Sequence, residues 1–147
     1  MDIENEHFRA IERAEAAGTS ALLARALDRL AEYYYREQRY REAASAYRRS
    51  LGLWRDILGP AHPIVARLLV SLGQIYVQLD KLPEAEPLFR QALSIIESSG
   101  AVGDAQVAEA LEVYATRLRR SGRQDQANSV ETRFRRVAQL ATAGARA

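Results

Sequence analysis

Residues 69–93, LVSLGQIYVQLDKLPEAEPLFRQAL, decide the fold of this chain of 147 residues. Apolar or small side chains recur there at the i, i+3, i+4, i+7 spacing of one α-helix face, at Leu69, Leu72, Gly73 and Tyr76. After a polar break, a second apolar stripe runs through residues 85–96. Pro83 marks the start of this second helix, because proline in the first turn loses no backbone hydrogen bond. The stretch therefore predicts a pair of antiparallel amphipathic helices.

The same pattern returns at an offset of 42 residues (72 − 30 and 114 − 72), which superposes three segments of the chain. Small residues are needed where two helices approach closely, and large residues where they interlock, so a repeat of both kinds indicates a repeated fold unit. The large residues coincide at Leu30, Leu72 and Tyr114, and the small ones at Ala43, Ala85 and Ala127. The repeat predicts three helix pairs, at about residues 21–61, 62–103 and 104–142.

Turn-forming residues separate these pairs. Gly59, Pro60 and Pro63 stop one helix and restart the next between the first and second pairs. The third pair begins after Gly100, and Asp104 is expected to cap its first helix.

The two ends of the chain lie outside the repeat. Residues 1–18 predict one capping helix that ends at Gly18, with Phe8 and Ile11 facing inward. Residues 143–147 are expected to form a short tail.

The middle pair carries the motifs of a known family. Leu69-x2-Leu72-Gly73-x2-Tyr76 and Ala85-x3-Phe89 match the tetratricopeptide repeat pattern. The 42-residue spacing, the linker Leu-Gly-Pro-Ala-His-Pro at 58–63 and the run Glu-Ala-Glu-Pro-Leu-Phe at 84–89 resemble the kinesin light chain variant of that repeat. HEAT and armadillo repeats have a similar period but lack these motifs.

The resemblance covers about residues 21–140. It departs from the pattern in the third pair, where Glu131 stands in the aromatic position held by Tyr47 and Phe89. The resemblance implies an all-α, right-handed superhelical solenoid of antiparallel helix pairs: about three tetratricopeptide units and an N-terminal helix, seven helices in all. It also implies a non-catalytic adaptor or scaffold that binds a peptide or protein segment in its concave groove.

In such a solenoid the first helix of each pair lines the groove, through the face opposite its core stripe. The expected groove residues are Arg25, Asp28, Arg29, Glu32, Tyr35 and Arg36 in the first pair, Arg67, Val70, Ser71, Gln74, Val77 and Gln78 in the second, and Glu109, Glu112, Thr116, Arg119 and Arg120 in the third. We expect the Arg and Gln side chains to hydrogen-bond the backbone of an extended or helical peptide. Val70, Val77 and Tyr35 are expected to receive its apolar anchors.

Some tetratricopeptide proteins hold the C-terminal carboxylate of a chaperone with Lys and Asn at set groove positions. The corresponding positions here carry Asp28, Glu32, Ser71, Glu109 and Val113. Because the acids would repel a carboxylate, we do not expect a receptor for chaperone tails.

The sequence offers no candidate for catalysis, a cofactor or a metal. Cysteine is absent, and the two histidines, His7 and His62, lack partners at ligand spacing. His62 lies in the linker, where a role in loop packing is expected. Gly100 and Gly103 lack the lysine and the strand of a phosphate-binding loop. We therefore expect a protein that is not an enzyme and needs no cofactor.

The composition also indicates the cellular location of the protein. The first residues carry acids and no apolar run, and no stretch reaches the ~20 apolar residues of a membrane span. We expect a cytoplasmic protein without membrane contact, and the single lysine beside many arginines suggests a bacterial gene.

Charge is uneven along the chain. Residues 1–16 hold five acids and two arginines, a net −3, whereas residues 117–147 hold eight arginines and two acids, a net +6. Self-association through these complementary ends, or as a dimer that buries the incomplete third unit, is the alternative to peptide binding.

The arginine cluster leaves a more remote alternative, an anionic partner such as RNA or an acidic protein surface. Its members are Arg117, Arg119, Arg120, Arg123, Arg133, Arg135 and Arg136. The only aromatic residues nearby, Tyr114 and Phe134, occupy core positions, so stacking on single-stranded bases is not expected.

Overall fold

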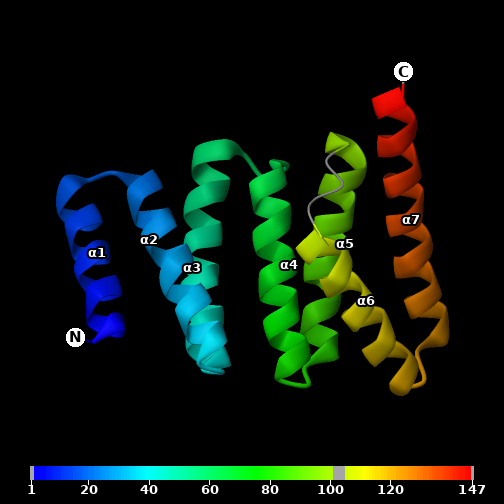
Figure 1. The fold of residues 1–147 in the computed structure, drawn as a ribbon, viewed down its shortest axis with the longest axis horizontal. Helices are drawn as coiled ribbons and strands as arrows, with labels where there is room; N and C mark the ends of the chain where they lie inside the picture. The colour runs from blue at the N-terminus through cyan, green and yellow to red at the C-terminus, as the bar shows by residue number, and fades with distance from the viewer. Residues whose placement is uncertain (1, 101–104, 147) are drawn as a thin grey trace. The chain divides into compact units, whose positions relative to one another are not determined.

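The structure, a computed structural model, describes residues 2–100 and 105–146. Within these residues it contains seven α-helices and no strand (Figure 1). The helices are α1 (Ile3–Ala17), α2 (Ser20–Arg36), α3 (Tyr40–Leu58), α4 (Pro63–Gln78), α5 (Leu82–Ser99), α6 (Ala105–Arg120) and α7 (Gln124–Arg146). The predicted all-α class with seven helices is confirmed. Helix α7 reaches Arg146, beyond the boundary at residue 142 that was expected for the third pair, and the expected cap Asp104 lies outside the described residues.

The chain divides into two compact units, Met1–Pro60 and Ala61–Ala147. In the first unit α2 packs against both α1 and α3. Their shared core is built from residues that follow the helical period, Ile11, Leu27, Leu30, Tyr34, Tyr47, Leu51 and Trp54, with alanines at the close contacts. The capping helix α1 begins where the Asp2 carboxylate accepts a hydrogen bond of 3.1 Å from the Glu4 backbone N–H. It ends at Gly18, which takes the left-handed conformation.

In the second unit α4 packs against α5 and α6, and α7 packs against α6 and α5. The buried side chains include Leu69, Leu72, Ile75, Phe89, Leu93, Tyr114 and Leu118. Helix α4 is capped by His62, whose Nδ1 atom accepts a hydrogen bond of 3.1 Å from the Ile64 backbone N–H. His62 is therefore a helix cap, a structural role in the linker as the sequence suggested.

The two helices of each pair are joined by the same type of turn. Gln38, Asp80 and Gly122 all have left-handed backbone, with φ of 60°, 58° and 81°. In each turn the next backbone N–H bonds to a carbonyl of the preceding helix, which is the arrangement of a Schellman cap. The three bonds, each 2.8 Å long, join Arg39 to Tyr34, Lys81 to Tyr76 and Arg123 to Leu118. The 42-residue repeat inferred from side chains is thus repeated in backbone geometry.

Candidate functional site

The predicted binding stripe on α2 is largely present as an exposed surface. Arg25, Arg29, Glu32 and Arg36 are exposed, as expected. Tyr35 is half-buried, and its ring lies edge-on to the ring of Tyr40, with 5.4 Å between the ring centroids. This face of the first unit therefore presents mainly charged side chains.

Asp28 was expected on the same stripe but has a different role. Its carboxylate accepts hydrogen bonds from the Ser50 hydroxyl and from the Trp54 indole N–H, the latter 3.0 Å long. Ser50 is fully buried and also donates to the Ala24 carbonyl at 3.2 Å. Asp28 is thus turned toward α3, where it satisfies buried polar groups of the core.

The predicted stripe on α4 is only half accessible. Arg67 and Gln78 are exposed and Gln74 is half-buried. Val70, Ser71 and Val77 are 1%, 8% and 1% exposed. Val70 and Val77 therefore cannot receive apolar anchors from a peptide, and this expectation is wrong for them. Helix α4 carries apolar residues around most of its circumference, and such a helix is packed on several sides.

The predicted stripe on α6 is exposed at Glu109, Glu112, Thr116 and Arg120. Arg119 is half-buried instead and forms an ion pair with Glu131 of α7. Hydrogen bonding between the two groups raises the pKa of Arg119 and lowers the pKa of Glu131, so both stay charged. Arg119 therefore holds α6 to α7.

The position of this ion pair explains the departure of the third repeat from the family pattern. Arg119 and Glu131 are the 42-residue equivalents of Val77 and Phe89. Phe89 is 1% exposed and stacks on Tyr114 of the following pair, with 4.3 Å between the ring centroids. Glu131 is half-buried, and a charged pair is tolerated where solvent reaches it.

A polar cluster anchors the capping helix α1, and the sequence pattern did not indicate it. The Glu4 carboxylate accepts hydrogen bonds of 2.9 Å from the Tyr34 hydroxyl and from Nη1 of Arg39. Arg39 also pairs with Glu42 and lies over the Tyr34 ring, 4.5 Å from its centroid. The hydrogen bond from Arg39 lowers the pKa of Glu4, whereas burial raises the pKa of Tyr34 to about 12. Glu4 lies 30 positions before Tyr34 and 35 positions before Arg39, so no local spacing reveals these contacts.

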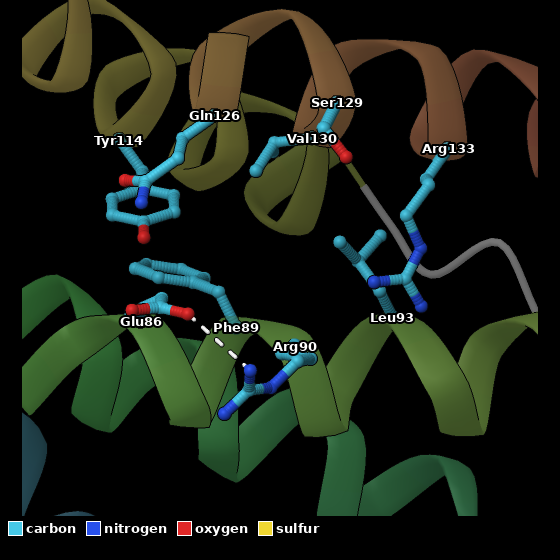
Figure 2. A pocket seen from close by; sticks show the side chains of 9 residues that line it. All are labelled: Glu86, Phe89, Arg90, Leu93, Tyr114, Gln126, Ser129, Val130 and Arg133. Carbon is cyan, nitrogen blue, oxygen red and sulfur yellow. Dashed lines mark ion pairs between the residues drawn. The ribbon is translucent and has the colours of Figure 1, made fainter. Parts of the chain in front are cut away.

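The second unit contains a cavity of about 120 Å³ between α5, α6 and α7. Phe89 and Leu93 of α5, Tyr114 of α6 and Val130 of α7 form its apolar wall. Figure 2 shows the α5 side chains and the α7 side chains facing each other across the cavity, with the Tyr114 ring above that of Phe89. Its polar residues are Glu86, Arg90, Gln126, Ser129 and Arg133. None of the lining residues belongs to the predicted groove.

Among the described residues, no cluster of three or more His, Asp or Glu side chains is arranged to hold a metal ion. In the same part of the chain, no helix combines the length and apolar character needed to cross a membrane.

Comparison with known proteins agrees with this geometry. The family model of the tetratricopeptide repeat matches residues 22–98, which is more than half of the 147 residues. Among solved structures, the crystal structure of BtubC (BKLC) from P. vanneervenii matches with a TM-score of 0.75 and 24% sequence identity. The match covers 93% of this chain and 55% of that chain, so this chain spans about half the length of BtubC. At this identity the likeness shows the fold alone. The comparison with curated proteins found no match.

Proposed function

This chain belongs to the tetratricopeptide repeat family, and from that membership we propose that it is a non-catalytic adaptor or scaffold that binds a segment of another protein. Tetratricopeptide repeats are protein–protein interaction modules in general. We place the contacts on the exposed faces of the first helices of the repeats, α2 in the first unit and α4 and α6 in the second, each unit taken by itself. The cytoplasm of a bacterium is the proposed location, on the composition of the sequence.

One observation carries the proposal. The first helices expose long donor side chains on the face opposite their buried stripe, Arg25, Arg29 and Arg36 on α2 and Arg67 and Gln78 on α4. Arginine presents several N–H donors in a planar fork and holds carbonyl or carboxylate oxygens well. Because Val70 and Val77 are buried, we propose that hydrogen bonds and charge contacts dominate this surface.

The pattern of charges on this surface limits the kinds of partner segment that can bind. Glu32, Glu109 and Glu112 are exposed beside the arginines, so the surface is mixed in sign. A partner segment with both acidic and basic residues complements it better than a segment of one sign. Glu32 and Glu109 also support the exclusion of a terminal carboxylate as the main recognition element.

Display of a random peptide library tests the proposal, followed by measurement of the affinity of the selected peptides. A double variant, Arg36→Glu with Arg67→Glu, removes two exposed arginines from α2 and α4. The matched control, Arg41→Glu with Arg136→Glu, makes the same change of charge on α3 and α7, where the arginines are also exposed. We expect the first variant to weaken binding about 10-fold or more and the control to change it little. Equal losses in both would show a nonspecific charge effect and overturn the proposal.

A further inference from the structure

The cavity in the second unit is large enough for one apolar side chain, and charged side chains stand at its rim. Its volume of about 120 Å³ compares with the roughly 150 Å³ of an engineered apolar cavity that holds benzene. Phe89, Leu93, Tyr114 and Val130 give it an apolar wall. An aromatic ring therefore matches the cavity in volume and in chemistry.

Two arginines stand at this cavity, and each retains donors for another carboxylate. Arg90 pairs with Glu86 at 3.4 Å, and its side chain is 62% exposed. Arg133 pairs with Glu97 at 2.7 Å, and its side chain is 31% exposed. A guanidinium has five N–H donors, and an exposed pair one turn apart on a helix contributes little. An acidic group that arrives beside an apolar one can therefore be bound here.

The chain itself carries an element of matching chemistry. Phe8 of α1 is 42% exposed, although it was expected to face inward. Glu4 and Glu12 lie one helical turn before and after it, and Glu12 is exposed. Glu4 is engaged by Arg39 and Tyr34, so Glu12 is the carboxylate available to a partner.

We propose that the cavity between α5, α6 and α7 receives helix α1 of a second copy of this chain, with Phe8 inserted and Glu12 paired with Arg90 or Arg133. This contact joins two different surfaces, so it is heterologous and can be repeated head to tail. A contact made by one inserted ring and one ion pair is expected to bury less than a standard interface of about 1,600 Å², so we expect a dissociation constant in the micromolar to millimolar range. The contact is independent of the peptide-binding surface, because the two share no residue.

Two single variants test the two sides of the contact one at a time. Phe8→Ala removes the inserted ring and leaves the cavity intact, whereas Ser129→Trp fills the cavity from its exposed rim and leaves α1 intact. Circular dichroism checks that each variant is folded, and Phe8→Leu keeps an apolar side chain as a second check on α1. Sedimentation equilibrium of the full chain from micromolar to millimolar concentration, at low and at high salt, gives the mass.

We expect the wild type to associate more strongly at low salt, and each single variant to raise the dissociation constant about 10-fold or more. A mixture of the two variants should form a 1:1 dimer and no larger species, because only one productive contact remains. A charge exchange, Arg90→Glu in one copy with Glu12→Arg in the other, should restore part of the lost affinity.

Three results would overturn the proposal. The wild type could remain a monomer throughout, which would leave the cavity to another partner. It could associate with no change in either variant, which would place the contact elsewhere. The mixed variants could also fail to form a dimer. The peptide affinities measured with Arg36→Glu and Arg67→Glu are unaffected by any of these outcomes, so the two proposals fail separately.

Discussion

At the scale of single residues, the contact between Gly73 and Phe89 shows how little space the second unit allows. A Cβ atom built on Gly73 would lie 2.8 Å from the Phe89 ring, closer than real contacts permit. A Cβ atom on Gly52 of α3 would meet nothing within 4 Å. The glycine of the Leu-Gly-x2-Tyr motif is therefore required by packing between α4 and α5.

We expect Gly73→Ala to destabilise the fold by about 1–3 kcal/mol, because the overpacking outweighs the better helix propensity of alanine. Gly52→Ala makes the same chemical change in open space and should stabilise it by about 0.5–1 kcal/mol. Urea denaturation followed by far-UV circular dichroism measures both. The prediction is contradicted if the two variants shift the midpoint in the same direction.

The left-handed turns give a second prediction. Gln38 occupies with φ of 60° the position that Gly122 occupies in the third turn. The left-handed conformation costs a residue with a Cβ atom about 1–2 kcal/mol, and glycine avoids this cost. Glycine has more conformational freedom in the unfolded chain, which offsets part of that gain. Gln38→Gly should therefore raise the free energy of unfolding by about 0.5–1 kcal/mol. Glu37→Gly, at an ordinary φ of −81°, is the control and should lower it.

Asp28 offers a test of the buried polar network. Asp28→Ala leaves the Trp54 N–H and the Ser50 hydroxyl without this acceptor, at a cost of about 1–3 kcal/mol. Trp54 is the only tryptophan of the chain, so its fluorescence reports the change directly. Glu32→Ala, on the exposed side of the same helix, should alter neither the emission nor the stability. Unchanged emission in Asp28→Ala would show that the indole is bound in another way.

The role of Asp28 marks a limit of the sequence at this scale. Leu30, Leu72 and Tyr114 could be predicted as core residues because size and period agree at each of them. Asp28 lies at the right spacing for the outer stripe, and only its three-dimensional neighbours Ser50 and Trp54 show that it turns toward α3. The orientation of a polar side chain depends on its hydrogen-bond partners, and the partners of Asp28 are distant in the sequence.

At the scale of the helix, we expect the docking of α1 to depend on pH. Glu4 has a pKa below its ordinary value of 4.5, because Arg39 donates a hydrogen bond to the charged form. A carboxylate whose pKa is lower in the folded state stabilises that state above the unfolded pKa, and the contribution is lost as pH falls through the folded value. The docking of α1 is therefore expected to be strongest from weakly acidic to neutral pH.

We expect Glu4→Gln to lower the urea midpoint at pH 7, and the difference from the wild type to shrink below about pH 4. Glu12→Gln changes an exposed carboxylate on the same helix and serves as the control, at a protein concentration too low for the contact between copies to form. A constant difference between wild type and Glu4→Gln across the whole pH range would contradict the assignment.

The burial of α4 explains a second error of prediction. A stripe at the spacing of residues 30 and 34 was assigned to the core, and the opposite face was assigned to solvent. This rule holds for α2, which packs against α1 and α3 and still exposes Arg25, Arg29 and Arg36. Helix α4 packs against α5 and α6 and buries Val70 and Val77 in addition to its core stripe. A repeat pattern identifies the first contact face of a helix, but it does not show which other faces are covered.

At the scale of the whole chain, each unit has a core of its own, and the ion pairs described above each join residues of one unit. Repeat arrays unfold as a sum of local stabilities and neighbour terms. A variant such as Gly73→Ala, in the second unit, should therefore shift the unfolding midpoint seen by far-UV circular dichroism more than the midpoint seen by Trp54 fluorescence, which reports the first unit. Equal shifts would mean that the units unfold as one.

The structure also changes the interpretation of the positive charge near the C-terminus, because some of these arginines form ion pairs. Seven arginines suggested an anionic partner, yet Arg119 pairs with Glu131 and Arg133 pairs with Glu97. Part of the cluster therefore holds α7 in place, which favours its structural interpretation. The sequence could predict the charge of this region but not its division between internal pairs and open surface.

The three equal turns have a consequence for how this chain can change in length. One residue inserted between the helices of a pair would change the spacing of this turn and remove the hydrogen bond that closes it. The segment 59–62 between α3 and α4 carries no such bond pattern and can absorb an insertion at lower cost. Among natural variants of this protein, insertions and deletions should therefore accumulate at residues 59–62 and spare residues 37–39, 79–81 and 121–123.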